Sequence, residues 1–369
     1  MILSALSLKN FRTHKNTILN FSETLNYIVG GNGQGKTSVL EAAYYLCTTK
    51  SFNSKDVEAV SFNENEFEIK GNFKDITEDK IKLVFSTPEN RKYYFQNDKL
   101  ISRSSQIIGR FPVVILTPAD HEITQGAPSE RRKFVDSVIS QASSTYLNLL
   151  LDYNKTLKHR AVVLNLLREN KTKQLETELD AWTEKLIESG VELINHRKKF
   201  LDDFNRYVFE AYNKIVDDKE KPSIYYNFLD GTDAIEIKNI FEKILSDRRE
   251  EEIRRSVNLV GPHKDDFIFN INDINLRTYG SQGQHKTFQA ALRFAEFFYL
   301  KEATGKTPIF LLDDVFGELD AYRAGKISDY LKEVGQALIT ITDFADFSFL
   351  TKGTKDLVIK LNNGQIVYA

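Results

Sequence analysis

Residues 30–37 read GGNGQGKT and match the pattern Gly-x-x-x-x-Gly-Lys-Thr. An apolar stretch, LNYIV, precedes them and a helix-forming stretch, SVLEAAYYL, follows, which is the context that this pattern requires. Glycines let the backbone close around phosphate groups, and the N–H groups of the loop and of the helix start bind them. We therefore predict a nucleotide phosphate site formed by Gly30, Gly31, Asn32, Gly33, Gln34, Gly35, Lys36, Thr37 and Ser38.

Two side chains of this loop have distinct expected roles. Lys36 is expected to reach the β and γ phosphates, and the Thr37 hydroxyl is expected to bind Mg²⁺. The alternative is a glycine-rich turn with a surface lysine, which the flanking strand and helix disfavour.

A second acidic motif lies far along the chain, in IFLLDDVFGELD at 309–320. Its apolar run predicts a buried strand that ends in Asp313, placed to hold the Mg²⁺ shell, and Asp314 follows where a carboxylate can orient or deprotonate the attacking water. An ordinary strand end also fits this motif when it is taken alone. Together with the phosphate loop it predicts an ATPase with three catalytic residues, Lys36, Asp313 and Asp314. The long separation of the two motifs indicates a large insertion.

A second glycine-bearing loop, YGSQGQHKT at 279–287, precedes another helical stretch. Ser281 can cap that helix, while Gly283 presents its N–H group to an anion. The first loop already surrounds one nucleotide, so we predict that residues Ser281, Gln282, Gly283 and Gln284 cover the γ-phosphate held by the partner in a head-to-tail dimer. A simple helix N-terminal turn is the alternative.

The elements that must position these motifs alternate at both ends of the chain. Strands are expected at 2–8, 25–29, 308–314 and 337–343, helices from 38, 285 and 321, and a final hairpin at 357–369. Short strands between 60 and 116 indicate an antiparallel β-subdomain. Residues 129–216 show helical spacing, with a reversal near 168–174. We predict an α/β fold in which 1–128 and 257–369 form one ATPase domain, and 129–256 form a helical insertion with short coiled arms.

Composition limits the other possibilities. The chain has 369 residues, a formal net charge of −2 and a single cysteine, so neither a polybasic tail nor a disulfide framework is present. No stretch approaches the roughly 20 apolar residues of a membrane helix, and we expect a soluble, cytoplasmic protein. DNA would have to bind at a local patch, for which Arg131, Arg132 and Lys133 are candidates. A solvated helix face is the alternative for these three residues.

The order of motifs resembles the ABC-type ATPases: phosphate loop, insertion, signature loop, acidic strand. Within that class it resembles the RecF family, through LSLKNFRTHKN, GGNGQGKTSVLEAAYYL, QGAPSERRKFVD, LVGPHKDDF, YGSQGQHKT and LLDDVFGELD. The resemblance implies that Ser281 meets the partner's γ-phosphate and that Asp320 ends the D-loop. Asp314 stands where ABC ATPases usually have glutamate, and Thr342 where many have a switch histidine. Both departures suggest slow hydrolysis.

The resemblance also implies a function. It implies a weak, DNA-stimulated ATPase that uses ATP and Mg²⁺, forms an ATP-dependent homodimer, and binds single-stranded, gapped or junction DNA. Its expected roles are recombinational repair, recombinase loading, replication-fork maintenance and the SOS response, with RecR and RecO as partners and no membrane. An SMC-type chromosome-organising ATPase, a transporter ATPase subunit and a purely structural scaffold are the alternatives.

Overall fold

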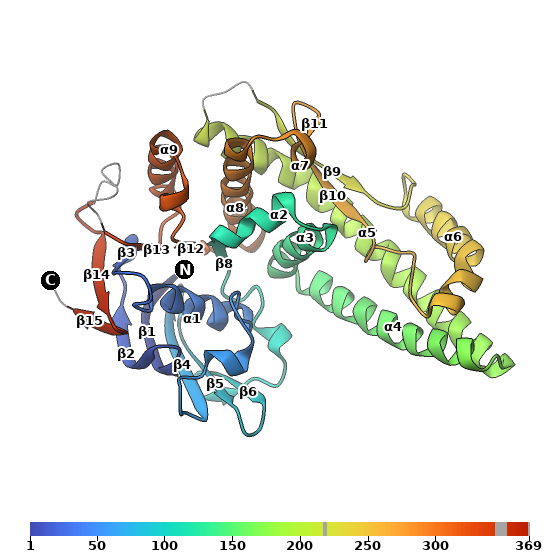
Figure 1. Ribbon diagram of the computed structural model, residues 1–369, viewed down its shortest axis with the longest axis horizontal. Coiled ribbons are helices and arrows are strands. Elements are labelled where there is room, and N and C mark those ends of the chain that lie inside the picture. The colour runs from blue at the N-terminus through green and yellow to red at the C-terminus, as the bar shows by residue number, and fades with distance from the viewer. Residues whose placement is uncertain (217–219, 344–352, 368–369) are drawn as a thin grey trace. The chain divides into compact units, whose positions relative to one another are not determined.

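The computed structural model describes residues 1–216, 220–343 and 353–367 (Figure 1). Contacts between residues divide the chain into two compact units. The first unit contains 1–121, 207–220 and 281–369, and the second contains 122–206 and 221–280. Among the described residues, no helix is long and apolar enough to cross a lipid bilayer.

A mostly parallel sheet organises the first unit, in the order β15-β14-β3-β13-β12-β8. Every residue of β3, β13 and β12 is buried, as expected for parallel strands that are covered on both faces. The predicted strands in this sheet and the hairpin at Asn363–Gly364 are therefore confirmed, although residues 368–369 lie outside the described part. The strand bounds are β3 Leu25–Val29, β8 Val113–Leu116, β12 Ile309–Asp313, β13 Ala337–Ile341, β14 Leu357–Asn362 and β15 Gln365–Val367.

An antiparallel sheet forms the rest of the first unit's β structure, in the order β2-β1-β4-β5-β6-β7. The predicted antiparallel subdomain is confirmed, but it also includes β1 and β2. The sequence analysis missed β2 because two of its buried positions carry the polar residues His14 and Thr17, which hide the apolar alternation. The strands are β1 Ile2–Phe11, β2 His14–Asn20, β4 Glu66–Lys74, β5 Glu78–Ser86, β6 Arg91–Gln96 and β7 Lys99–Leu100.

Helix α1 (Lys36–Thr48) joins the two sheets (Figure 1). It packs against β8, β12 and β13 of one sheet and against β1, β4 and β5 of the other. A helix covered on two sides needs apolar residues around most of its surface, and Val39, Leu40, Ala42, Ala43, Tyr45 and Leu46 are all buried. Because α1 begins directly after the loop that follows β3, its packing fixes the position of the phosphate loop.

Two further helices of the first unit pack against each other, and one of them lies on β8. Helix α8 (Gln282–Thr304) lies against β8, and its Phe294 stacks on Tyr330 of α9 (Ala321–Leu331) at 4.1 Å between ring centroids. The predicted helix start at His285 was three residues late. Tyr207, in the end of α5 that belongs to this unit, donates to Glu302 at 2.6 Å. Short 3₁₀ turns lie at Asp56–Ala59, Ser104–Gln106, Pro118–Asp120 and Phe316–Glu318.

The second unit is mainly helical, as predicted. Helices α4 and α5 run side by side (Figure 1), and α4 ends at Glu169 and α5 begins at Lys173, which confirms the predicted reversal. Val163, Leu164, Leu167, Leu179 and Ile253 form a small core there. The elements are α2 His121–Gln125, α3 Pro128–Ala142, α4 Ser144–Glu169, α5 Lys173–Ile215, β9 Pro222–Asn227, α6 Ala234–Arg255, β10 Asp266–Ile271, β11 Ile274–Asn275 and α7 Leu276–Tyr279.

The compact units do not coincide with the predicted domain limits. Strands β9 and β10 pair antiparallel over six residues, from Asp266–Asn227 to Ile271–Pro222, so the segment 257–280 clusters with the second unit. Residues 207–220 cluster instead with the first unit. The domain limits at 129 and 256 therefore remain a prediction. The compact units are a separate division of the chain, based on contacts such as the pairing of β9 with β10.

A buried ion pair holds three elements of the second unit together. Arg160 of α4 donates to Glu252 of α6 at 2.6 Å, to Asn258 at 2.7 Å and to Thr183 of α5 at 2.9 Å. The Arg160 and Glu252 side chains are only 1% and 0% exposed. Glu252 also accepts from the Leu259 backbone N–H at 2.7 Å, so both of its oxygens face donors. Such a pair is stable only when every charge has its partners.

We predict that Glu252→Gln destabilises the protein by about 3 kcal/mol in urea unfolding, because the amide NH₂ must face one of two donors and Arg160 keeps an uncompensated charge. The matched control is Glu250→Gln on the same helix, whose side chain is 78% exposed in its pair with Lys171. That control should change stability by less than about 1 kcal/mol. Equal effects of the two substitutions would contradict the assignment.

Candidate nucleotide site

The loop at 30–35 connects the buried end of β3 to the first residue of α1. Gly33 and Gly35 have φ values of 77° and 93°, in the left-handed region that favours glycine. A Cβ at Gly35 would also lie 2.7 Å from His14 Nε2. The N-terminus of α1 has no side-chain cap, so its N–H groups are available to an anionic ligand.

Lys36 is almost completely buried at the base of this loop. Its Nζ donates to the carbonyl oxygens of Gly30 at 2.7 Å and Gly31 at 3.0 Å. Burial lowers the pKa of Lys36, and the nearby carboxylates of Asp314 and Asp313 oppose this shift. The ammonium group therefore lies inside the loop, where phosphate oxygens can replace the carbonyls as its acceptors.

The structure brings Thr37 and Asp313 together, as the sequence predicted. Thr37 Oγ1 donates to Asp313 Oδ1 at 2.9 Å, and Thr340 Oγ1 of β13 donates to the same oxygen at 2.9 Å. Burial raises the pKa of Asp313, while the hydrogen bonds from Thr340 and Thr37 oppose the shift. Hydroxyl and carboxylate oxygens suit Mg²⁺, so these residues fit the ion. Within the described residues there is no cluster of three His, Cys, Asp or Glu that would form a separate metal site.

Asp314 is exposed beside this pair and lines the same cavity as Lys36 and Thr37. Its φ of 50° is unusual for a residue other than glycine, and its backbone N–H donates to Thr340 Oγ1 at 2.9 Å. Unusual backbone conformations of this kind persist where surrounding contacts enforce them, often at functional sites. Thr340 thus holds both aspartates, a role that the sequence analysis missed because a threonine inside a buried strand carries no motif.

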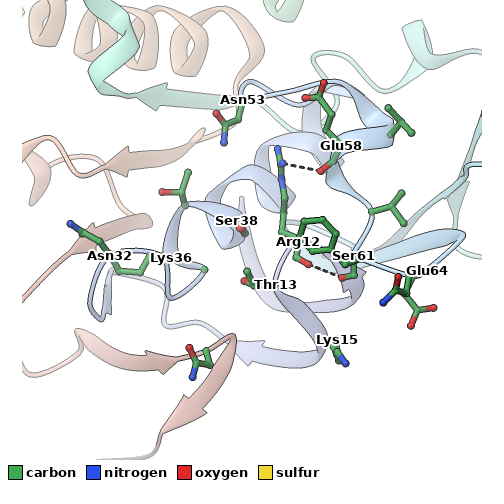
Figure 2. Close-up of a pocket in the computed structure, with 18 of the residues that line it drawn as sticks. Arg12, Thr13, Lys15, Asn32, Lys36, Ser38, Asn53, Glu58, Ser61 and Glu64 are labelled. Carbon is green, nitrogen blue, oxygen red and sulfur yellow. Dashed lines mark hydrogen bonds between the residues drawn. The ribbon is translucent and has the colours of Figure 1, made fainter.

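A cavity of about 1080 Å³ opens over the loop (Figure 2). Figure 2 shows Asn32, Lys36 and Ser38 of the loop and helix start, together with Arg12 and Thr13 from the connection between β1 and β2 and with Lys15 of β2. Its remaining wall comes from residues 53–64, Thr87 and Asn363. The volume is at the upper end for small-ligand sites, which suits a nucleoside triphosphate. The sequence analysis did not predict that residues 12–15 or 53–64 line a ligand site.

Arg12 is fixed in this wall by its own contacts. Its guanidinium donates to Glu41 at 2.9 and 2.7 Å, and to the Glu58 carbonyl at 3.0 Å (Figure 2). Glu41 lies on α1 and is fully buried. The pair therefore ties the β1–β2 connection to the helix that carries Thr37.

The second glycine-bearing loop begins helix α8 and does not line this cavity in the described structure. Ser281 Oγ accepts from the Gln284 backbone N–H at 3.2 Å, and Gln284 Oε1 accepts from the Ser281 N–H at 2.9 Å. This reciprocal capping box closes the helix start. Gln284 Nε2 also donates to Glu220 at 2.6 Å. Two helix starts of one unit thus differ: the first is open over a cavity and the second is closed by its own side chains.

Arg323, which the sequence analysis missed, connects that helix start to the predicted D-loop. Asp320 caps α9 by accepting from the Arg323 backbone N–H at 3.0 Å, and it also accepts from the Arg323 guanidinium. The same guanidinium donates to Thr287 at 2.8 Å, and a Cβ added at Gly283 would lie 2.9 Å from it. Asp320 and the Ser281–Gln284 loop are therefore adjacent.

Thr342 follows β13 and is half-buried. The residue of this strand that contacts Asp313 is Thr340, two positions earlier. The role of Thr342 as the switch residue remains a prediction.

The basic stretch at the start of α3 does not form one surface. Arg131 is 3% exposed and donates to both carboxylate oxygens of Asp266 at 2.7 and 2.9 Å, so the predicted DNA contact is wrong for its guanidinium. Arg132 donates to the Asp265 carbonyl, while Lys133 is exposed and pairs with Glu130. Consecutive helical residues point about 100° apart, which separates these three side chains. Lys133 and the half-buried Arg132 stay candidates for DNA.

The open glycine loop, the buried acidic strand end and the two sheets around α1 define an ATPase head of the ABC and SMC type. The family model described as RecF/RecN/SMC N terminal domain matches residues 2–348. The DNA replication and repair protein RecF of Salinibacter ruber is 39% identical over 93% of this chain and 85% of its own length. The chain belongs to the RecF family.

Solved structures agree with this assignment. That of the recombination mediator protein RecF with ATPrS, in the RecFOR pathway, superimposes with a TM-score of 0.90 at 33% identity, covering 99% of this chain and 97% of that one. The Smc head domain of Pyrococcus furiosus gives 0.57 at 17% identity, which shows a shared fold alone.

We predict that Thr340→Val lowers the rate of ATP hydrolysis at saturating ATP by about tenfold, because Asp313 and Asp314 lose their common partner. Phosphate release measures the rate, and Thr340→Ser should keep most of it because the hydroxyl remains. Thr342→Val tests the sequence-based alternative. A larger loss from Thr342→Val than from Thr340→Val would show that residue 342, not 340, organises the aspartates.

Proposed function

We propose that this protein is an ATP-driven dimer that binds DNA while its two nucleotides are enclosed and that opens after hydrolysis. The observation that carries the proposal is that Lys36 and Thr37 line one cavity and that Thr37 is hydrogen-bonded to Asp313, while the Ser281–Gln284 loop lies outside that cavity. The first group supplies the functional groups needed to bind a triphosphate. The Ser281–Gln284 loop would supply a further anion site, which lies outside the cavity that contains Lys36.

Lys36 would bind the β and γ phosphates together with the open N–H groups of α1. Thr37 and Asp313 would hold Mg²⁺, which when bound supplies positive charge against the phosphate oxygens. Asp314 is exposed to the cavity and would orient the attacking water or take its proton. Aspartate has a shorter side chain than the glutamate usual in ABC ATPases, so hydrolysis would be slow and the nucleotide would act mainly as a switch.

The dimer would complete each site with the partner's Ser281–Gln284 loop. For this, the capping box must exchange its internal hydrogen bonds for bonds to the γ-phosphate. Ser281 and Gln282 are exposed, so a phosphate held by the partner can approach them. Two RecF structures were solved with ATPrS and with ATP, which supports binding of the same nucleotide here. Asp320 and Arg323 would lie at the same interface.

DNA binding would follow from differential affinity. If DNA binds the closed dimer better than the monomer, ATP and DNA favour each other's binding. Relatives named as DNA replication and repair proteins, and a recombination mediator of the RecFOR pathway, support DNA as the ligand, and we propose single-stranded, gapped or junction DNA as its form. From the family resemblance we further propose a cytoplasmic role in recombinase loading, replication-fork maintenance and the SOS response, with RecR and RecO as partners. Helices α4 and α5, of 26 and 43 residues, are short for the arm of an SMC protein, which disfavours the alternative of an SMC-type chromosome-organising ATPase.

We predict that Lys36→Met weakens ATP binding by at least about tenfold and abolishes ATP-dependent dimerisation and DNA binding, since the phosphates lose their buried cation. Sedimentation and gel-shift assays with and without ATP measure the two effects. DNA binding and dimerisation that persist unchanged in this variant would refute the switch.

We predict that Ser281→Arg leaves ATP binding by the monomer within about twofold of wild type but abolishes ATP-driven dimerisation, because a large cation would block the partner's γ-phosphate. A fluorescent ATP analogue and sedimentation measure the two properties. Ser143→Arg, which removes the N-cap of α4 outside the predicted interface, controls for loss of a helix cap. If Ser281→Arg dimerised normally, the loop would be an ordinary helix start and the predicted contact with the partner's nucleotide would be wrong.

A further inference from the structure

The turn Asn363–Gly364 of the last hairpin lies against the phosphate loop, although the chain places them far apart. Strand β14 pairs parallel with β3, and β15 contacts β2. Both turn residues have positive φ, 47° and 73°, as the tight Asn-Gly hairpin turn requires. This conformation points the backbone N–H groups of the turn at Gln34.

Gln34 receives two hydrogen bonds from the turn. The Gly364 N–H donates to the Gln34 carbonyl at 3.2 Å, and the Asn363 N–H donates to the Gln34 side-chain oxygen. A Cβ added at Gly30 would lie 2.6 Å from the Leu361 carbonyl oxygen. The hairpin thus contacts the loop at both its beginning and its end.

Two polar residues of β2 hold the turn in place. Thr17 Oγ1 donates to the Gly364 carbonyl at 2.6 Å, and His14 Nδ1 lies 3.1 Å from the same oxygen. His14 Nε2 lies 3.0 Å from the Gly35 carbonyl oxygen, so each ring nitrogen faces a backbone carbonyl, and the tautomer of the neutral ring decides which of the two nitrogens donates. His14 and Thr17 are both buried, in a β-strand whose one other buried residue, Leu19, is apolar.

Buried polar groups in such a position need a reason, because burial costs free energy unless each group is bonded. Here every described hydrogen bond of the Thr17 hydroxyl and of the His14 ring ends on the turn, on the phosphate loop or on each other. We call His14, Thr17 and the Asn363–Gly364 turn the clasp. Asn363 and the adjacent Thr13 also line the nucleotide cavity.

We propose that the clasp positions the phosphate loop for nucleotide binding, with Thr17 and His14 as positioning residues that act through Gly364, Gln34 and Gly35. The inference rests on the proposed function of this cavity as an ATP site. A loop held in its binding conformation loses less conformational freedom when the ligand binds, so the clasp raises affinity without touching the phosphates. Asp313 and Asp314 are held separately by Thr340, so the clasp should affect binding more than turnover.

The test is the affinity of the full chain for a fluorescent ATP analogue with Mg²⁺, together with the hydrolysis rate at saturating ATP. Thr17→Val should weaken binding about three- to tenfold, the equivalent of one hydrogen bond, with turnover within about twofold. Thr17→Ser keeps the hydroxyl and should bind within about twofold of wild type. Equal affinities of Thr17→Val and wild type would overturn the proposal, and so would a failure of serine to restore binding in a folded protein.

Gly364→Ala provides a second variant if Thr17→Val does not fold. Its Cβ would lie 2.7 Å from the Thr13 carbonyl oxygen, and its expected effect is a similar loss of affinity. Gly305→Ala is the matched control, because its φ of 66° carries the same strain but no atom lies within 4 Å. Equal binding by Gly364→Ala and Gly305→Ala would overturn the clasp. Absence of binding by the wild-type chain would instead overturn the proposed ATP site.

Discussion

The hydrogen bond from Thr37 to Asp313 is the contact on which the arrangement of the first unit depends. It joins residues 276 positions apart and requires β3 and β12 to lie in one sheet with β13 between them. The first and last parts of the chain must therefore fold together, while the intervening segment leaves and returns. The entropy cost of closing a loop grows only slowly with its length, so a long insertion is compatible with this constraint.

The buried charges are satisfied within each unit. Arg160 binds Glu252, Arg131 binds Asp266, and in the first unit Arg293 binds Asp120 at 2.7 and 2.8 Å. Each guanidinium presents several donors in a fixed plane, so one arginine can hold carboxylates and carbonyls from different elements. The basic stretch at the start of α3 therefore contains a structural cation, Arg131. The exposed fraction of a side chain distinguishes such residues from those that can bind phosphate.

The two glycine-bearing loops are chemically different despite their similar sequences. The start of α1 has no side-chain cap and faces a cavity with a buried lysine, whereas the start of α8 is closed by Ser281 and Gln284 and is held to Asp320 through Arg323. An uncapped helix start binds an anion without rearrangement, and a capped one must first exchange its own bonds. This difference accounts for two such loops in one chain: one suits nucleotide binding within the unit, and the other suits a contact that forms only when a partner arrives.

The sequence by itself determined the features that depend on local pattern. The phosphate loop, the strand ending at Asp313, the helical insertion and the Asn363–Gly364 hairpin were all predictable, because glycine conformation, apolar periodicity and turn chemistry act over a few residues. Only the tertiary structure decided the others. Thr340 and Arg323 belong to no motif, His14 lies in a stretch to which the sequence analysis gave no role, and Arg131 was misassigned, because the roles of these residues come from partners distant in sequence. Such contacts depend on strand order and packing. The partners do not lie at a fixed separation along the chain, so no local sequence pattern reveals them.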